Sequence, residues 1–401
     1  MKTDTLLILG GYGNTGQSIA RLLLKETDCH VVLAGRDLAR AEAMARALAS
    51  KHGSERVSAV RADAADPSSL RQAMEGCRLA VVASSTPAYA GQVARAALDT
   101  GTDYLDVQVS TAKLGALSAL EEDIRRAGRC FITDGGFHPG LPAVLVRYAG
   151  SRFEHLTRAE VGSVIRVEWA RLDIGATAIE ELVGLAGSQI LEFQKGTWRP
   201  ARWTAMWTPR TMDFGPVFGR QYCVPMFLEE MRSLPELYPG LRRVGFYVGG
   251  LNWFVDWVVF PLAWLAMRVW PRRALRPMAR LMHWGLCRFS RPPYGTLLKL
   301  EADGLVRGTA RHLELTLSHA DAYELTAIPV VACLLQYLDG TARRPGLWLQ
   351  AHVAEPERML RDMERMGVAI SLVEPVPGRE RTAEEHWAQT PAHSVTPSGP
   401  A

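Results

Sequence analysis

The sequence predicts an α/β protein of two domains, the first built on a parallel sheet with crossover helices and the second of the α+β class. Its 401 residues exceed the roughly 100–200 residues of one ordinary domain. Residues 1–135 alternate strand-like and helix-like patterns, whereas strand patterns of period two become prominent after residue 142. With 48% hydrophobic and 22% charged residues the composition is globular, which excludes collagen-like, wholly disordered and disulfide-stapled classes.

Six short, continuous apolar runs in the first domain predict strands that helices cover on both faces. These strands are expected at 6–9, 31–34, 57–61, 79–83, 104–107 and 130–133. Helices are expected between them, at 14–25, 38–50, 68–75, 91–99 and 114–127. The pair Asp66-Pro67 marks a helix start, because Asp accepts hydrogen bonds from the first amides and Pro is tolerated at the first helical position.

Longer alternating patterns characterise the second domain. Val161–Trp169 and His312–Leu317 predict strands of period two, and Asp303-Gly304 predicts a turn that joins two strands. Helices are expected at 176–190, 322–338 and 356–366. Gly367 is placed to cap the last of them.

These patterns divide the chain into four parts. The first domain is expected to cover 1–142 and the second 143–345. Residues 346–373 are expected to form a helix and a strand that pack back onto the two domains. Residues 374–401, which are rich in Pro, Gly, Ser, Thr and charge, predict a disordered tail.

A glycine-rich turn follows the first predicted strand and opens a helix. Gly11, Gly13 and Gly16 fit the pattern G-x-G-x-x-G, in which the first glycine permits a tight turn, the second admits a pyrophosphate and the third lets helix and strand pack closely. An anion then binds at the helix N-terminus. We therefore predict that the whole turn contacts the dinucleotide, through Gly10, Gly11, Tyr12, Gly13, Asn14, Thr15 and Gly16.

The end of the second strand indicates which dinucleotide binds. An NAD site usually has an acidic residue there, but this chain has Ala34 and Gly35, followed by Arg36. A guanidinium can hold a 2′-phosphate bidentately, so Arg36 favours NADP(H) as the cofactor. Asp37, which follows, can instead serve as the cap of the next helix.

Two further loops are expected to line the cofactor. Asp63, after the third strand, is a candidate partner of the adenine amino group or a cap of its own loop. Ser84, Ser85 and Thr86 follow the fourth strand and are expected either to line the cofactor or to cap the helix that begins near Pro87.

Taken together, these stretches resemble the saccharopine dehydrogenase-like oxidoreductases. The matching segments are GGYGNTG at 10–16, AGRD at 34–37, YLDV at 104–107, GGFHPGLP at 135–142, PGL at 345–347 and ERMGV at 364–368. The resemblance implies an NADP-binding Rossmann domain, a second α+β domain whose sheet lies over the cofactor, and pairing as a homodimer. It is closer to the branch of trans-acting enoyl reductases and animal saccharopine dehydrogenase-like oxidoreductases than to lysine-pathway enzymes. Where family members read Tyr-x-Asp-x-Thr-Gly-Glu, this chain has Gln108, Val109 and Ser110 at the last three positions.

Hydride transfer to C=O, C=N or C=C leaves an anion that needs a proton donor near the carboxyl ends of the strands. His138 is predicted as this donor, because imidazole ordinarily titrates near neutral pH and the residue sits in a Gly/Pro-rich loop. Asp106 is expected to orient the donor or bind the ribose, Tyr104 to assist or to lie in the core, and Lys113 is a further candidate. His138 can alternatively serve the loop structure alone. No metal-ligand spacing stands out.

An apolar and then basic stretch occupies residues 244–291. Gly249-Gly250, Asp256 and Pro261 interrupt the apolar run, which argues against a membrane span. No acidic residue lies between Trp257 and Leu300, while arginines accumulate there. On a helical wheel Arg273, Arg276, Arg280 and Arg291 fall opposite Leu275, Met278, Met282, Leu286 and Phe289. The pattern favours association with a membrane surface over a buried core or a dimer interface.

The prediction that results is an NADP(H)-dependent oxidoreductase, cytoplasmic and peripheral on the inner face of a membrane, that reduces a C=C or C=O bond of a hydrophobic substrate. The alternatives are a soluble opine or amino-acid dehydrogenase acting on C=N, and a non-enzymatic NADP(H) sensor. Six scattered cysteines without a CxxC pair suit reduced thiols in the cytosol. The net charge of +4 is too small to argue for nucleic acid, and no nucleic-acid motif accompanies the arginines.

Overall fold

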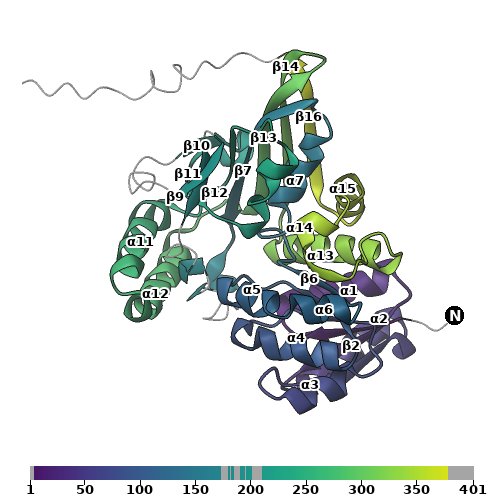
Figure 1. Cartoon of the computed structure of the whole chain (residues 1–401). Coiled ribbons are helices and arrows are strands. Elements are labelled where there is room, and N and C mark those ends of the chain that lie inside the picture. Colours follow the sequence, from purple (N-terminus) through teal and green to yellow (C-terminus); the bar gives the residue numbers. More distant parts are fainter. Residues whose placement is uncertain are drawn as a thin grey trace, which may run out of the picture.

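In the computed structural model, described here for residues 4–172, 179–180, 182–184, 190–194, 196–200 and 210–377, the chain forms two sheets that share one apolar core (Figure 1). The first sheet has seven parallel strands in the order β15-β6-β5-β4-β1-β2-β3. Its strands are β1 (Thr5–Leu9), β2 (His30–Gly35), β3 (Val57–Arg61), β4 (Leu79–Val82), β5 (Asp103–Asp106), β6 (Cys130–Thr133) and β15 (Gly346–Leu349). The six predicted N-terminal strands are confirmed, and β15 adds a seventh.

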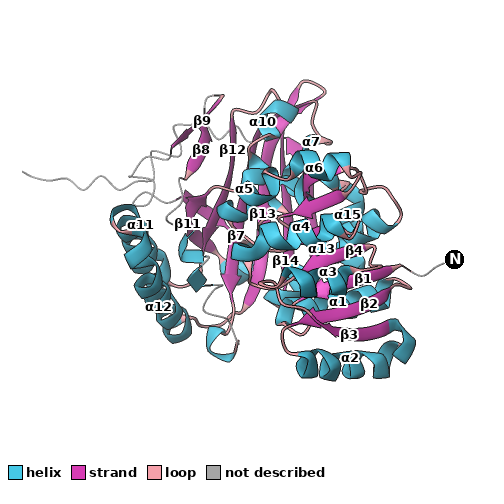
Figure 2. Ribbon diagram, turned by 60° about the horizontal axis from the view of Figure 1, so that its bottom comes forward, coloured by secondary structure: helices cyan, strands magenta, loops and turns pink. Residues whose placement is uncertain are grey.

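Helices cover both faces of this sheet, as the continuous apolar strands require (Figure 2). They are α1 (Asn14–Glu26), α2 (Leu38–His52), α3 (Pro67–Met74), α4 (Ala90–Asp99), α5 (Thr111–Ser118) and α6 (Glu121–Arg126). The single helix predicted over 114–127 is wrong. The Ser110 side chain caps an earlier start, and at Leu120 the amide bonds to the Leu117 carbonyl three residues back, a tight turn that separates α5 from α6.

Within the described residues the second sheet has nine strands, and β12, β7 and β13 lie at the middle of its main path. The main path runs β10 (Arg210–Asp213), β11 (Arg220–Met226), β12 (Arg243–Gly249), β7 (His155–Arg166), β13 (Gly295–Val306), β14 (Thr309–His319) and β16 (Ala369–Pro377), with β8 (Leu191–Gln194) on β12 and β9 (Thr197–Pro200) on β8. The predicted strand at 161–169 therefore begins six residues earlier and ends at Arg166. Trp169 instead begins the short helix η3 (Trp169–Arg171).

The turn predicted at Asp303-Gly304 is wrong. Both residues lie inside β13, at an irregularity in its pairing with β7. A side chain at Gly304 would meet the His155 carbonyl oxygen at 2.5 Å and the Phe153 ring at 2.6 Å, so close packing rather than a turn explains the glycine. The β13–β14 turn lies at Arg307 and Gly308, whose φ angles of 50° and 70° are those a two-residue hairpin needs.

The remaining helices follow the first domain along the chain. They are α7 (Pro142–Gly150), α9 (Gly215–Phe218), α10 (Leu234–Leu237), α11 (Phe260–Val269), α12 (Pro271–Phe289), α13 (Ala322–Leu338), α14 (Gln350–Val353) and α15 (Pro356–Arg365). The predicted helices at 322–338 and 356–366 are confirmed, and Gly367 follows α15 with φ of 113°. The helix predicted at 176–190 falls largely outside the described residues.

The C-terminal segment ties the two sheets together. β15 pairs with β6 in the first sheet and β16 pairs with β14 in the second. β16 reaches Pro377, so the strand runs beyond the point at which the tail was expected to begin. Residues 378–401 lie outside the described part of the chain. The face of the second sheet that carries Val161, Leu300 and Leu315 packs with α7, α13 and the first sheet into one core, which fixes this sheet against the dinucleotide domain.

Candidate cofactor and active site

The glycine-rich turn has the geometry of a phosphate cradle. α1 starts at Asn14 after Gly13, and no side chain caps its first turn. A Cβ on Gly16 would collide with the Gly10 carbonyl oxygen. The left-handed residue is Gly10, with φ of 86°, so the tight turn belongs to Gly10 rather than to Gly11 as predicted. The uncapped amides and the helix dipole suit a pyrophosphate.

Beyond the turn, a surface pocket gathers cations where the adenosine end of a dinucleotide would lie. Its lining consists of Tyr12, Arg36, Asp37, Leu38, Arg40 and Arg61. The Arg40 guanidinium lies 4.8 Å from the centre of the Tyr12 ring. None of the three arginines forms an ion pair within the described residues. Three unpaired guanidinium groups around one pocket fit a 2′-phosphate.

For two aspartates near this pocket the sequence left two roles open, and in the structure both act as caps. Asp37 Oδ1 accepts a hydrogen bond from the Arg40 amide at 3.1 Å and so caps α2. Asp63 Oδ1 accepts from the Ala65 amide at 3.0 Å and so caps its own loop. Asp37 therefore does not take the place of the acidic residue of an NAD site.

Arg61 is a pocket residue that no sequence pattern indicated. Arg61 ends β3, which lies next to β2 in the parallel sheet, so its side chain emerges at the edge from which Arg36 follows. The sequence feature that could have identified Arg61 is a basic residue at the carboxyl end of the strand next to β2. Its use required the strand order, because only a pairing of β2 with β3 places both ends together.

The loop after β4 lies beside the glycine turn. A Cβ on Gly10 would come within 2.8 Å of the Ser84 amide nitrogen, so the two loops touch. Ser84 Oγ and Thr86 Oγ1 are 2.8 Å apart, and Gln108 Nε2 donates to Ser84 O at 2.6 Å. Thr86 precedes the short helix η2 (Pro87–Tyr89) without capping it through its side chain, and Ser85 is exposed. The helix-capping alternative is therefore wrong for Thr86.

At the carboxyl ends of β5 and β6, a lysine is buried between two carboxylates. Lys113 Nζ, fully buried, donates to Asp106 Oδ1 at 2.7 Å and to Asp134 Oδ1 at 2.6 Å. Burial alone would lower the pKa of Lys113, but the two carboxylates outweigh it and raise that pKa above its usual value. Asp106 Oδ2 accepts from Thr133 Oγ1 at 2.7 Å. This ion cluster holds β5, β6 and α5 together.

The expected part of Asp106 and Tyr104 in proton transfer does not agree with this geometry. Asp106 has no exposed surface, and both of its oxygens accept hydrogen bonds from neighbours. Tyr104 is also fully buried and stacks on Phe131 at 5.1 Å. Burial, reinforced by Asp106, raises the pKa of Tyr104 well above its usual value. Both residues therefore serve the architecture of the sheet edge.

His138 lies in the loop between β6 and α7. Its ring contacts one aromatic ring from the same loop and one from the second sheet. Its ring centre is 3.9 Å from that of Phe137 and 5.6 Å from that of Phe246 on β12. Nε2 is enclosed and has no hydrogen-bond partner in the described structure. Burial lowers the pKa of His138 to about 4, so the expectation that it titrates near neutral pH is wrong and the ring is neutral at pH 7. A neutral imidazole can still polarise a carbonyl through its N–H group.

A nucleotide cradle, a cationic 2′-phosphate pocket and an enclosed histidine at the same edge of a parallel sheet define a dinucleotide-dependent oxidoreductase. Bound NADPH would supply the hydride. Residues 6–132 match the family model described as "Saccharopine dehydrogenase NADP binding domain". The first domain is therefore similar to the NADP-binding domain of saccharopine dehydrogenases, and the protein is an NADP(H)-dependent oxidoreductase.

Solved structures support the fold over most of the chain. Apo saccharopine dehydrogenase (L-Glu forming) from Saccharomyces cerevisiae superposes with a TM-score of 0.67 at 14% identity, over 92% of this chain and 100% of that one. A myo-inositol dehydrogenase from Corynebacterium glutamicum gives a TM-score of 0.44 at 13% identity, over 94% and 100% of the two chains. At such identities the first likeness shows the fold alone, and the second is too low to carry an argument.

Proposed function

We propose that this NADP(H)-dependent oxidoreductase reduces a C=C or C=O bond of a hydrophobic substrate, of lipid, isoprenoid or polyketide type, which it meets at a membrane surface. The observation that carries the proposal is the exposed apolar side of a helical hairpin, formed by the π-helical turn η6 (Val255–Val259), α11 and α12, that stands at one side of the second sheet (Figures 1 and 2). The apolar surroundings of His138 support the second part of the proposal, the reduction of an uncharged carbonyl or enoyl group.

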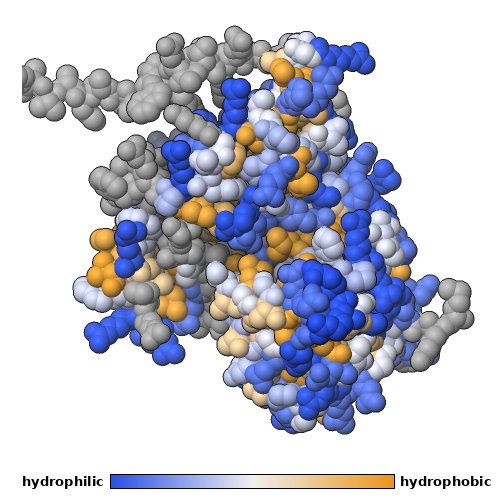
Figure 3. Space-filling view, viewed as in Figure 1, coloured by the Kyte–Doolittle hydropathy of each residue, from blue (hydrophilic) through white to orange (hydrophobic). Residues whose placement is uncertain are grey.

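Large apolar side chains on this hairpin and its flank face solvent, and Figure 3 shows hydrophobic surface in the same region. The exposed members are Trp253, Trp257, Val258, Leu262, Leu265, Val269, Trp270 and Trp284. Trp270 is 64% exposed and Leu265 54% exposed. A concentration of exposed apolar side chains of this kind marks an interaction site rather than ordinary surface, and tryptophans are enriched where protein meets lipid headgroups.

The sequence placed the apolar face on the wrong helix. Met282 and Leu286 of α12 are fully buried against η6 and α11, so this face of α12 forms internal core. Arg291 lies beyond the end of α12 and is not part of its basic face. The exposed apolar surface comes instead from the outer side of η6 and α11. Within the described residues no helix has the length and hydropathy to span a bilayer.

Exposed arginines border the apolar patch. Arg268, Arg273, Arg280 and Arg288 have no carboxylate partner among the described residues, and Arg276 lies 3.9 Å from Glu180 while remaining 82% exposed. Each basic residue near an anionic leaflet contributes about 1 kcal/mol. An apolar face with a cationic border is the pattern of an element that lies in the membrane interface.

The surroundings of His138 favour an uncharged substrate over an amino acid. Burial is the main cause of its lowered pKa, and no neighbouring charged group contributes to the shift. A dehydrogenase of opine type needs cations that converge on the substrate carboxylate near the reacting carbon. The neutral ring, beside Phe137 and Phe246, suits a carbonyl or enoyl group on an apolar chain.

Vesicle flotation tests the membrane part of the proposal. The protein should float with vesicles that contain phosphatidylglycerol and should float less with phosphatidylcholine alone. Changing Arg273, Arg276, Arg280 and Arg288 to Gln should weaken binding by roughly 10³-fold, from about 1 kcal/mol per arginine. The matched control changes Arg125 and Arg126 of α6, which are paired with acidic residues on the same helix. Equal flotation of both variants, or none of the wild type, would overturn the membrane proposal.

Metabolite comparison tests the substrate class. Lipid and polar extracts of cells with and without this gene should differ by a lipid that accumulates two hydrogens short of its normal product. Accumulation of a keto acid or an amine would instead support the C=N dehydrogenase. No change in either extract, with tight NADPH binding, would support the non-enzymatic sensor.

A further inference from the structure

Two buried side chains from distant parts of the sequence hold the loop that carries His138. This loop, Asp134–Leu141, joins β6 to α7 and contains three glycines. A loop rich in glycine and proline keeps one conformation only if other groups bind its backbone. Here those groups are Gln350 at the start of the loop and Glu230 at its end.

Gln350 binds the first half of the loop through both ends of its amide. Its Oε1 accepts from the Gly136 amide at 3.3 Å and its Nε2 donates to the Gly136 carbonyl at 3.1 Å. Gln350 has no exposed surface and begins α14, directly after β15. A Cβ on Gly140 would lie 2.7 Å from Gln350 Nε2, so the loop closes around this side chain.

Glu230 binds the second half. Its Oε2 accepts from the Gly140 amide at 2.6 Å and its Oε1 from the Ala143 amide at 3.1 Å. The residue lies in the short helix η5 (Glu229–Met231) of the second domain and has no exposed surface. It accepts backbone amides at the N-terminus of α7 and forms no ion pair within the described chain, so loop binding is what its buried carboxyl group does.

The two holding residues are themselves linked. His352 Nε2 lies 2.8 Å from the Glu230 carbonyl oxygen, and His352 belongs to the same short helix as Gln350. One assembly from η5 and α14 thus fixes both halves of the loop. Within the loop the bound positions are Gly136 and Gly140, and His138 lies midway between them in the sequence.

We infer that Glu230 and Gln350 are positioning residues, which keep the His138 ring enclosed and in place at the nicotinamide end of the cofactor site. The inference rests on the role proposed for His138, but it concerns the state of that ring and not the identity of the substrate. Held between these two side chains, His138 stays against Phe246 of the second sheet. Loss of either one exposes the ring to water.

The test is an NMR titration of His138 in the full chain, with ¹³Cε1-labelled histidine and the His138→Asn variant to assign its signal. In the wild type the signal should stay that of the neutral ring down to about pH 5. In Glu230→Ala and Gln350→Ala the midpoint should rise by 1–2 pH units toward 6.5, as the ring becomes solvated. Glu230→Gln, which keeps one acceptor, should fall between wild type and Glu230→Ala.

Glu229→Gln is the matched control. It changes a half-exposed carboxylate of the same short helix, which pairs with Arg232, and it should leave the His138 midpoint unchanged. Urea unfolding of each variant separates positioning from general stability. An unchanged midpoint in Gln350→Ala and Glu230→Gln, whether or not stability falls, would overturn the inference. Because the titration needs neither membrane nor substrate, it does not depend on the outcome of the flotation or metabolite experiments.

Discussion

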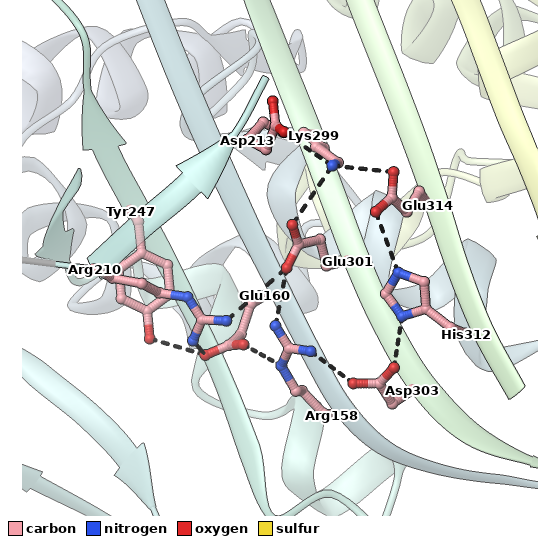
Figure 4. Close-up of polar contacts among 10 residues, drawn as sticks. All are labelled: Arg158, Glu160, Arg210, Asp213, Tyr247, Lys299, Glu301, Asp303, His312 and Glu314. Atoms are coloured by element: carbon pink, nitrogen blue, oxygen red, sulfur yellow. Dashed lines mark hydrogen bonds and ion pairs between the residues drawn. The ribbon is translucent and has the colours of Figure 1, made fainter. Parts of the chain in front are cut away.

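Arginines gather in two regions of the second domain, and the two regions use them in opposite ways. On the sheet face opposite the shared core, Arg158 and Arg210 both contact the carboxylate of Glu160 (Figure 4). On the α11–α12 hairpin, Arg273 and Arg280 have no carboxylate partner in the described chain. The same side chain therefore serves the fold in the first region and remains available to an external anion in the second.

The ion pairs around Arg158 and Glu160 join three strands of the sheet. Arg158 of β7 contacts Glu160 on its own strand, Glu301 and Asp303 of β13, and Arg210 of β10 also contacts Glu160. Burial would raise the pKa of Glu160, but Arg210 and Arg158 outweigh it and hold that pKa below its usual value. Helices α11 and α12 contain no acidic residue. What distinguishes the regions is the placement of acidic residues, because none occurs between residues 257 and 300.

The largest expected effect comes from breaking the paired region at its centre. Glu160→Ala removes a fully buried carboxylate and leaves two guanidinium groups without their main partner, and it frees the Tyr247 hydroxyl, which lies 3.2 Å from Glu160 Oε1. Loss of one member of a buried ion pair costs about 3–5 kcal/mol, so the free energy of unfolding in urea should fall by that amount. Glu122→Ala, in an exposed pair on α6, should cost less than about 1 kcal/mol. Equal losses in the free energy of unfolding would show that burial does not determine how much these ion pairs stabilise the fold.

A second prediction concerns the other unpaired arginines, those of the cofactor pocket. Arg36→Ala should weaken NADPH binding by about 10- to 100-fold, since a hydrogen bond to a charged group is worth about 1.5–3 kcal/mol, and should leave NADH binding nearly unchanged. Fluorescence titration of both cofactors measures this. The control is Arg46→Ala. Arg46 lies on α2, the helix that follows Arg36, but it pairs with Glu42 and does not line the pocket. Equal weakening of NADPH and NADH would contradict the assignment of the 2′-phosphate.

A smaller effect should come from pH at the rim of the sheet network. Hydrogen bonds to Asp303 and Glu314 raise the pKa of His312 to about 9, above the 6.5 of an unfolded chain. Its stabilisation is therefore complete below pH 6.5 and is lost as pH rises through 9. Because these groups are about one-third exposed, the loss should be only about 1 kcal/mol. Urea unfolding at pH 6 and pH 9 should show it in the wild type and not in His312→Gln.

The smallest effect is expected in the unpaired region. Arg273→Gln and Arg280→Gln should change the free energy of unfolding by less than about 0.5 kcal/mol, since neither side chain has a partner to lose among the described residues. The same variants should weaken vesicle flotation. A stability loss as large as that of Glu160→Ala would mean that these arginines belong to the fold, which would remove the contrast between the two regions.

Much of the first domain could be predicted from local pattern. The six strands, the glycine turn and Arg36 each depend on residues that are adjacent in sequence, and parallel strands that are buried on both faces leave a clear apolar signal. Predictions from local sequence failed where one pattern has two structural explanations, such as a glycine in a turn or in close packing, or an apolar helix face at the surface or in the core. Gly304 read as a turn because its packing partner, the Phe153 ring, lies on a different part of the chain.

The sequence by itself determined the chain's alternation of strand and helix, the phosphate cradle and the preference for a 2′-phosphate, because these follow from backbone freedom, apolar periodicity and charge at a strand end. Only the tertiary structure decided that Lys113 is buried between Asp106 and Asp134, that His138 is neutral, and that α12 turns its apolar face inward. Burial depends on which distant elements pack over a residue. It sets the local dielectric and the available partners, and so it decides which polar side chains bind a ligand and which hold the fold.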